Sequence, residues 1–247
     1  MNKSSLHWRT RDALPFGMKL MTSNTLEQLR ENLRRAESNA GKAWGVVSCG
    51  REVVDRFLPA GGLRRGTLVE WLASEPGSGA TTLALDAARS AAGDGRPIVV
   101  VDRRGWFYPP ALSEDWPLER LLVVRCRRDD EAFWACDQAL RTSGVGAVLT
   151  QCDAVDERRL RCWQLAAEQS GAVGLVVRHM TRQPEACFSD LRLLVAPSCA
   201  VGRRRVSLTL LRARQGRSGA MVEVALDDHA YSLPPSTASS GRQAAGV

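Results

Sequence analysis

Short apolar runs alternate with helical patterns through the middle of this chain. The runs are continuous and rich in β-branched residues, as in strands whose two faces are both covered. They occupy residues 67–72, 98–102, 121–124, 147–150 and 174–178, and helical patterns lie between them at 81–92, 130–142 and 156–170. Strands that alternate with helices form right-handed βαβ units around a parallel sheet. The pattern therefore predicts an α/β domain with three layers and a mostly parallel sheet.

The pattern changes near the carboxyl end of the chain. Residues 206–213 and 221–226 alternate apolar and polar side chains, and Gly216 and Gly219 lie between them. A period of two is typical of strands with one exposed face, and glycines favour the turn between such strands. We therefore expect a C-terminal antiparallel hairpin that extends the sheet.

An amphipathic helix is expected before the core domain. Leu26, Leu29 and Leu33 fall on one helical face, and Asn24 and Glu27 have the spacing of a capping box. Such a helix either docks on its own domain or binds a partner through its leucines. Both alternatives remain open from the sequence.

The predicted domain organisation has three parts. Residues 1–44 hold an aperiodic start and the amphipathic helix, and residues 45–233 form the core domain. Residues 234–247, PPSTASSGRQAAGV, are of low complexity, which predicts a disordered tail.

Composition excludes several classes of protein. Hydrophobic residues make up 44% of the 247 positions and charged residues 25%, as in ordinary globular domains. No apolar run reaches the roughly 18 residues that a membrane span needs. The amino-terminal segment carries charges and a proline where a signal peptide has an apolar stretch. We expect a cytoplasmic protein with no membrane partner.

The cysteines and histidines do not indicate a metal site. Seven cysteines are scattered and none is spaced as C-x-x-C: Cys49, Cys126, Cys136, Cys152, Cys162, Cys187 and Cys199. The three histidines lie far apart in the sequence. This distribution is typical of thiols in a reducing compartment.

The formal net charge is +7. A basic balance favours polyanionic partners. Six arginines fall within fifteen residues near the carboxyl end, namely Arg203, Arg204, Arg205, Arg212, Arg214 and Arg217. They form either a solvated loop face or a contact surface for nucleic acid.

A glycine-rich loop between an expected strand and helix is the most informative motif. It aligns with the phosphate-loop consensus as Ser74-Glu75-Pro76-Gly77-Ser78-Gly79-Ala80-Thr81. Main-chain N–H groups and a helix amino terminus bind phosphates in such loops. The second consensus glycine is Gly79 and the hydroxyl is Thr81, but Ser74 replaces the first glycine and Ala80 replaces the lysine.

Two further positions lack the groups that nucleotide hydrolysis needs. Asp102 ends the second expected strand, where a carboxylate would orient the attacking water, but Arg103 and Arg104 follow it. A magnesium-binding acid is expected at the end of the fourth strand, where Thr150 and Gln151 stand and Asp153 comes two or three residues late. Together with the missing lysine, these changes argue against ATP hydrolysis.

The segments around the loop resemble the RecA family. The run FLPAGGLRRG at residues 57–66 precedes the first strand, as G-G-[LI]-x-x-G does in that family, and Glu75-Pro76 and Thr81 match its loop. Residues 130–149 resemble the helix and strand of its second nucleotide motif, and His179 falls near the family's sensing glutamine. The resemblance covers roughly residues 50–226 and implies a RecA-like fold.

Among RecA relatives, the chain is similar to the ImuA family of bacterial mutagenesis cassettes. The similarity rests on the degenerate nucleotide site and on the segment LTLLRARQGRSG at residues 208–219. It implies a non-catalytic adaptor in DNA-damage tolerance by SOS-type translesion synthesis. The implied partners are a Y-family polymerase homologue (ImuB-like), RecA and an error-prone replicative-type polymerase, with single-stranded DNA as a further candidate. No cofactor is implied, although weak ATP binding stays open.

Two other functions remain as alternatives. In the first, Arg103 or Arg104 replaces the missing lysine in an ATP-binding recombinase, since arginine binds phosphate well. In the second, the protein is a RecA-linked inhibitor of cell division.

The aromatic residues are expected to serve mainly in packing. Trp71 follows a strand pattern, and Trp134 and Trp163 have helical spacing that predicts packing onto the sheet. Residues 106–108, Trp-Phe-Tyr, form a loop that either covers the domain surface or offers a stacking platform.

Overall fold

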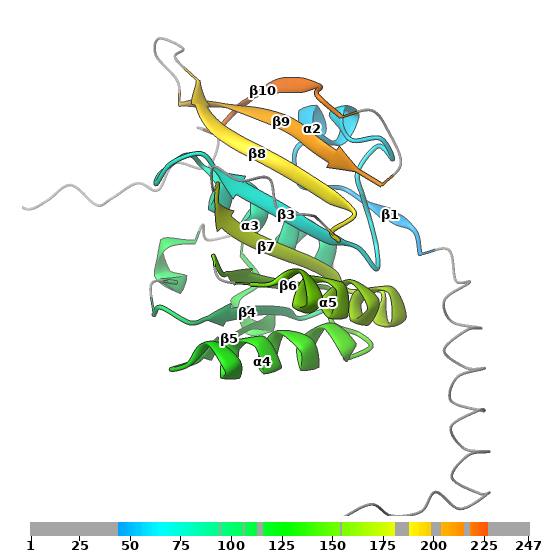
Figure 1. Ribbon diagram of the computed structural model, residues 1–247, viewed down its shortest axis with the longest axis vertical. Helices are drawn as coiled ribbons and strands as arrows, with labels where there is room; N and C mark the ends of the chain where they lie inside the picture. The colour runs from blue at the N-terminus through cyan, green and yellow to red at the C-terminus, as the bar shows by residue number, and fades with distance from the viewer. Residues whose placement is uncertain are drawn as a thin grey trace, which may run out of the picture. The chain divides into compact units, whose positions relative to one another are not determined.

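An eight-stranded sheet organises the domain (Figure 1). The computed structural model describes residues 44–93, 95–105, 107–112, 116–153, 155–180, 188–198, 204–214 and 218–226. The strand order is β10-β9-β8-β3-β7-β6-β4-β5. The strands are β3 (Leu68–Ala73), β4 (Ile98–Asp102), β5 (Leu121–Arg125), β6 (Ala147–Gln151), β7 (Val173–His179), β8 (Leu191–Ser198), β9 (Arg205–Ala213) and β10 (Met221–Ala225).

Six strands are parallel and two are not. Strands β5, β4, β6, β7, β3 and β8 pair in parallel, whereas β9 runs antiparallel to β8 and β10 antiparallel to β9. The expected parallel sheet and its C-terminal hairpin are therefore confirmed. Strand β8 was not predicted, and it is the strand through which the hairpin joins the sheet.

Helices cover both faces of the sheet. Helix α3 (Ala80–Ala92) packs on one face, and α4 (Asp129–Arg141) and α5 (Glu157–Ser170) lie together on the other. Smaller elements are α2 (Glu52–Phe57), the pair β1 (Val46–Val47) and β2 (Leu63–Arg64), and the 3-10 turns η1 (Pro109–Ala111) and η2 (Leu118–Arg120). The three layers match the expected α/β class. No helix among the described residues is long and apolar enough to cross a bilayer.

The alternation of side chains along the strands creates two apolar cores. In β3, for example, Val69 and Trp71 face the α3 side, while Leu68 faces α5. All six residues of β3 are buried because the strand lies inside the sheet between β7 and β8. Because β3 is central, its carboxyl end and the loop that follows it lie in the middle of the side of the sheet where the parallel strands end.

The tryptophans divide between core and surface. Trp71 and Trp163 are buried, as predicted. The prediction for Trp134 was wrong, because its side chain lies on the solvent face of α4 and is 67% exposed. Its neighbour Phe133 packs on Trp163 of α5 instead, with 6.0 Å between the ring centroids.

Candidate functional site

The glycine-rich loop lies between a central strand and a helix, as the sequence predicts. It connects the end of β3 to the start of α3, and Gly77 and Gly79 take the left-handed conformation with φ of 80° and 93°. Gly79 is the residue that caps α3, and no side chain caps the helix. The loop geometry predicted between strand and helix is therefore present.

The charge that binds phosphate is missing from this loop. Ala80, in the place of the lysine, is 3% exposed, and the first turn of α3 carries no acidic residue that would repel an anion. An ammonium group at this position would neutralise the phosphates of a nucleotide. Without it, the loop offers only main-chain dipoles and the hydroxyls of Thr81 and its neighbours.

The C-terminal hairpin packs directly on the loop. A Cβ atom built on Gly79 would lie 2.6 Å from Leu226 Cδ1 and 3.2 Å from Val206 Cγ1, and the φ of 93° also favours glycine there. Arg204 donates a hydrogen bond of 2.6 Å to the carbonyl oxygen of Gly77. The loop is therefore held by apolar contacts and an arginine of its own chain.

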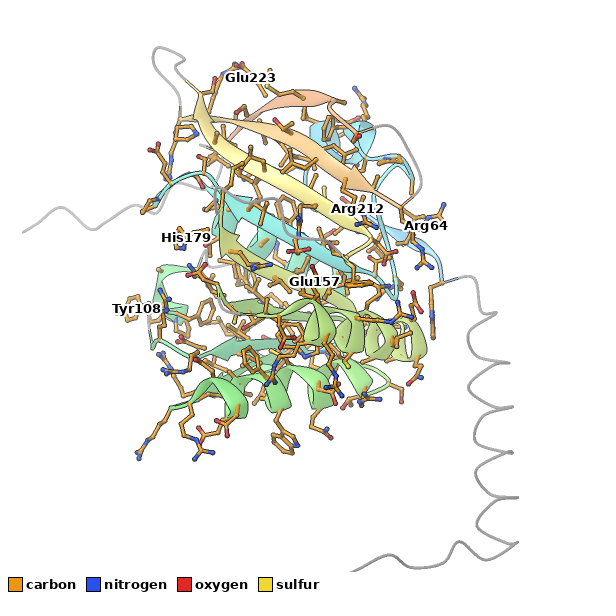
Figure 2. The ribbon with its side chains drawn as sticks, viewed as in Figure 1. Arg64, Tyr108, Glu157, His179, Arg212 and Glu223 are labelled. Atoms are coloured by element: carbon orange, nitrogen blue, oxygen red, sulfur yellow. The ribbon has the colours of Figure 1, made fainter. Side chains whose placement is uncertain are left out.

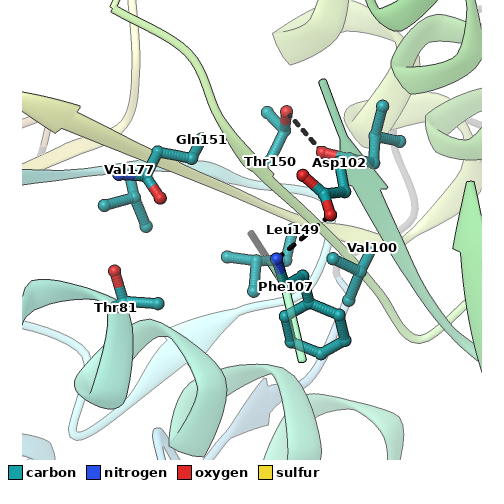
Figure 3. A pocket seen from close by; sticks show the side chains of 9 residues that line it. Thr81, Val100, Asp102, Phe107, Leu149, Thr150, Gln151 and Val177 are labelled. Atoms are coloured by element: carbon teal, nitrogen blue, oxygen red, sulfur yellow. Dashed lines mark hydrogen bonds between the residues drawn. The ribbon is translucent and has the colours of Figure 1, made fainter. Parts of the chain in front are cut away.

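Beyond the loop, the described residues enclose a small cavity between α3 and the ends of β4, β6 and β7 (Figure 3). Its volume is about 10 Å³, which is room for one water molecule at most. The lining is mainly apolar: Thr81, Val100, Val101, Asp102, Phe107, Leu149, Thr150, Gln151 and Val177. The buried ring of Phe107 occupies one side of this space.

Asp102 is engaged in structural contacts. Its carboxylate accepts hydrogen bonds from the main-chain N–H groups of Gly105 at 2.8 Å and Phe107 at 3.1 Å. Arg125 of the neighbouring strand β5 pairs with it at 2.7 Å, and the Asp102 side chain is 1% exposed. The carboxylate that could have oriented a water molecule instead anchors the loop after β4.

Asp153 is held in a similar way at the ends of β6 and β7. It accepts the main-chain N–H of His179 at 2.7 Å, its oxygens lie 3.1 and 3.2 Å from His179 Nδ1, and Arg104 pairs with it at 3.3 Å. Burial raises the pKa of Asp153, but the two contacts with His179 and the charge of Arg104 outweigh it, so the pKa lies below its ordinary value.

The positions for a magnesium-binding acid carry neutral side chains. The Thr150 hydroxyl donates to the carbonyl oxygen of Val101 at 3.1 Å. The amide oxygen of Gln151 is buried, and no hydrogen-bond partner for it is found in the described part of the chain. Neither residue offers the carboxylate that magnesium prefers.

Arg103 and Arg104 are both paired with acids. Arg103 forms an ion pair of 2.8 Å with Asp129 at the start of α4, and Arg104 pairs with Asp153. An arginine that replaced the phosphate-loop lysine would have to leave these partners. The geometry gives this alternative no support.

The four clustered arginines that the structure describes lie at the two ends of β9. Arg204 and Arg205 stand at the start of β9, near the phosphate loop, and Arg212 and Arg214 at its far end. Arg212 follows Arg205 by seven positions along the strand, which is roughly 23 Å. Figure 2 shows Arg212 well apart from Glu223, the residue that pairs with Arg205 at 3.6 Å.

Their contacts also differ. Arg214 forms ion pairs with Glu168 of α5 at 3.0 Å and with Asp190 at 3.4 Å, and these hydrogen bonds raise its pKa. The Arg205 side chain is 44% exposed. The remaining predicted contact residues lie outside the described residues: Leu26, Leu29, Leu33, Arg203 and Arg217.

Sequence reasoning missed a buried ionic cluster beside the site. Glu70 of β3 is 0% exposed, and it accepts hydrogen bonds from Ser189 at 2.6 Å, Arg178 at 3.1 Å and Arg192 at 3.2 Å. Arg178 also donates to the carbonyl oxygen of Asp153 at 3.3 Å. The available signal was a glutamate inside the apolar strand LVEWLA, with arginines in two later apolar runs.

Comparison with known proteins identifies the family. The chain is 30% identical to Protein ImuA from two strains of Caulobacter vibrioides, over 72% of this chain and 82% of theirs. It belongs to the ImuA family. The fold is similar to the crystal structure of the RadB recombinase, with a TM-score of 0.58 and 18% identity over 71% of this chain and 94% of that one. No family model matches the chain.

Membership of the ImuA family and the fold can be considered together. The RecA-like fold predicted from the glycine-rich segment is confirmed by the similarity to RadB. Family and fold together support a RecA-like protein related to DNA damage. Of the positions discussed above, Ala80, Thr150 and Gln151 are neutral, and Asp102 and Asp153 are engaged with partners from the same chain.

Proposed function

We propose that this ImuA-family protein is a non-catalytic RecA-like adaptor in bacterial DNA-damage tolerance. One observation supports the proposal: Asp102, which lines a cavity of about 10 Å³, and Asp153, at the ends of β6 and β7, are both held by partners from their own chain. A hydrolase needs these groups free to meet a nucleotide, a metal and a water molecule. The scaffold would therefore act by presenting surfaces.

The proposed partners follow from the family. They are a Y-family polymerase homologue, RecA and an error-prone replicative-type polymerase, and single-stranded DNA is a further candidate ligand. The proposal also assigns the protein to the cytoplasm. Within the C-terminal cluster, Arg205 and Arg212 are exposed and are our candidates for contact with phosphate or acidic side chains.

Nucleotide binding tests the non-catalytic part of the proposal. A fluorescent ATP analogue is titrated with the full-length protein, and ATP turnover is measured with and without single-stranded DNA, beside a RecA protein as positive control. We expect no saturable binding below millimolar nucleotide and no turnover. Submicromolar binding or DNA-stimulated turnover would refute this part.

Partner binding tests the adaptor part. The purified protein is titrated with a Y-family polymerase homologue from the same organism, and with labelled single-stranded DNA. Replacing Arg205 and Arg212 together by alanine should weaken DNA binding without lowering the melting temperature, because ionic contacts to phosphate dominate such affinity. Arg158→Ala, an exposed arginine on α5, is the matched control.

A further inference from the structure

Strand β10 forms one edge of the sheet and leaves part of its main chain open. Leu226 N–H donates to Arg204 and the carbonyl oxygen of Ala220 accepts from Leu210, each at 2.9 Å, so the even-numbered residues of β10 pair with β9. In an antiparallel ladder the alternate residues point their main-chain groups outward. These are Met221, Glu223 and Ala225.

Only one end of this edge is closed. Arg51, the residue before α2, donates a hydrogen bond of 2.6 Å to the outward carbonyl oxygen of Ala225. Within the described ranges, no hydrogen bond reaches the outward main-chain groups of Met221 or Glu223. The Met221 side chain is 65% exposed. An unpaired strand edge of this kind can pair with another chain.

A groove accompanies the open edge. A cavity of about 260 Å³ lies beside the end of β10, between residues 50–53, Asp86 of α3 and the last two residues of the strand. Val53 gives it an exposed apolar wall. Arg51 and Asp86 form an ion pair of 2.7 Å across it, and their side chains are 13% and 15% exposed.

From the edge and the groove together, we propose that β10 binds an extended peptide segment of a protein partner. The segment adds as a further strand beside Met221 and Glu223, and one of its side chains enters the cavity next to Val53. Main-chain pairing supplies affinity and the pocket supplies selectivity in this mode of recognition. The proposal rests on the adaptor function above and names the surface through which it operates.

The charges of the groove define the side chain that fits. Arg51 pairs with Asp86, and Glu52, which also lines the groove, pairs with Arg56, so a charged side chain that entered would lose water without gaining a free counter-ion. The cavity therefore favours an uncharged side chain. Its volume accommodates a large residue.

Glu223→Pro tests the main-chain pairing. The N–H of Glu223 points outward, so proline removes a donor for the added strand while the ladder with β9 stays intact. Glu223→Ala is the matched control, since it removes the carboxylate contacts with Ser198 and Arg205 and keeps the N–H. Circular dichroism and thermal unfolding establish that both variants fold.

The probes are overlapping labelled peptides that cover the Y-family polymerase homologue, together with the whole homologue. At least one peptide should bind the wild type and Glu223→Ala similarly, and bind Glu223→Pro about tenfold more weakly, the loss expected for one or two main-chain hydrogen bonds. Val53→Trp fills the groove and should weaken binding in the same way. If Glu223→Pro does not fold, the Val53→Trp variant alone tests the proposal.

The remaining outcomes separate the two proposals. If the whole homologue binds wild type, Glu223→Pro and Val53→Trp equally, the edge is not the docking site and the adaptor function stands. If the homologue does not bind the wild type at all, both proposals fall. If sedimentation shows self-association that Glu223→Pro abolishes, and no peptide binds, the edge pairs with a second copy and the inference is overturned. If the peptide residue on which binding depends is charged, the conclusion that the groove favours an uncharged side chain is wrong.

Discussion

Replacing Asp102 by asparagine distinguishes a structural carboxylate from a catalytic one. The wild-type carboxylate accepts two main-chain N–H groups and pairs with Arg125, all within 3.1 Å. Asparagine keeps one acceptor oxygen but loses the charge, and its NH2 group then faces one of the donors. Hydrogen bonds to charged groups contribute about 1.5–3 kcal/mol, and an unsatisfied buried donor adds to the loss. Arg125 is 49% exposed and can be hydrated, which limits the cost.

We therefore expect Asp102→Asn to lower the free energy of unfolding by about 2–3 kcal/mol. For a domain of this size that corresponds to a fall in melting temperature of roughly 5–10 °C, which calorimetry measures directly. Asp129→Asn is the control, because that carboxylate is 56% exposed in its pair with Arg103 and should cost less than about 1 kcal/mol. A melting temperature equal to the wild type, combined with loss of a nucleotide-dependent activity, would refute the structural role of Asp102.

Three further substitutions test the site. Ala80→Lys should lower the melting temperature by crowding a buried position, at a cost of about 1–3 kcal/mol, and should not create saturable ATP binding in a fluorescence titration. Leu226→Ala should cost about 2–4 kcal/mol in chemical denaturation, because Leu226 is 7% exposed and packs on Gly79. The lowered pKa of Asp153 means that its ionised form stabilises the fold above about pH 4 and that this contribution is lost as pH falls further. Asp153→Asn should therefore have a lower melting temperature than the wild type at pH 7, and the difference should be much smaller at pH 3.

The strands, the helices on the sheet and the glycine-rich loop could be predicted because each carries a local pattern. Strand β8 could not be predicted in the same way. It contains Arg192 and Pro197 among its apolar residues, and a proline usually argues against an inner strand. Arg192 is tolerated because Glu70 of the neighbouring strand accepts its hydrogen bonds. The partner that explains the pattern lies 122 residues away in the sequence.

The position of Trp134 shows a second limit. Trp134 adjoins Phe133 on α4, and helical spacing alone does not decide which of two adjacent aromatic residues faces the neighbouring helix. In the structure, Phe133 also packs under Arg159 of α5, whose guanidinium carbon is 4.1 Å from the ring centroid. That packing turns the adjacent tryptophan toward solvent.

Proximity in sequence did not indicate how the clustered arginines are spaced. Because β9 is extended, Arg204 and Arg205 lie at its start, and Arg212 and Arg214 lie at its far end. The missing charges of the phosphate loop, in contrast, could be read from single positions. The contacts of Asp102 and Asp153 could not be predicted from the sequence, because their partners Arg125 and His179 come from other strands.

The changes in the nucleotide site depend on one another. With no lysine at position 80, the hairpin packs on the loop through Leu226, and Arg204 satisfies a loop carbonyl. Asp102 and Asp153 then find cationic or N–H partners within the chain. A charge restored at position 80 would oppose these contacts. The same hairpin presents the edge of β10 beside the groove at α2, and a surface that is already formed favours pairing with an extended segment.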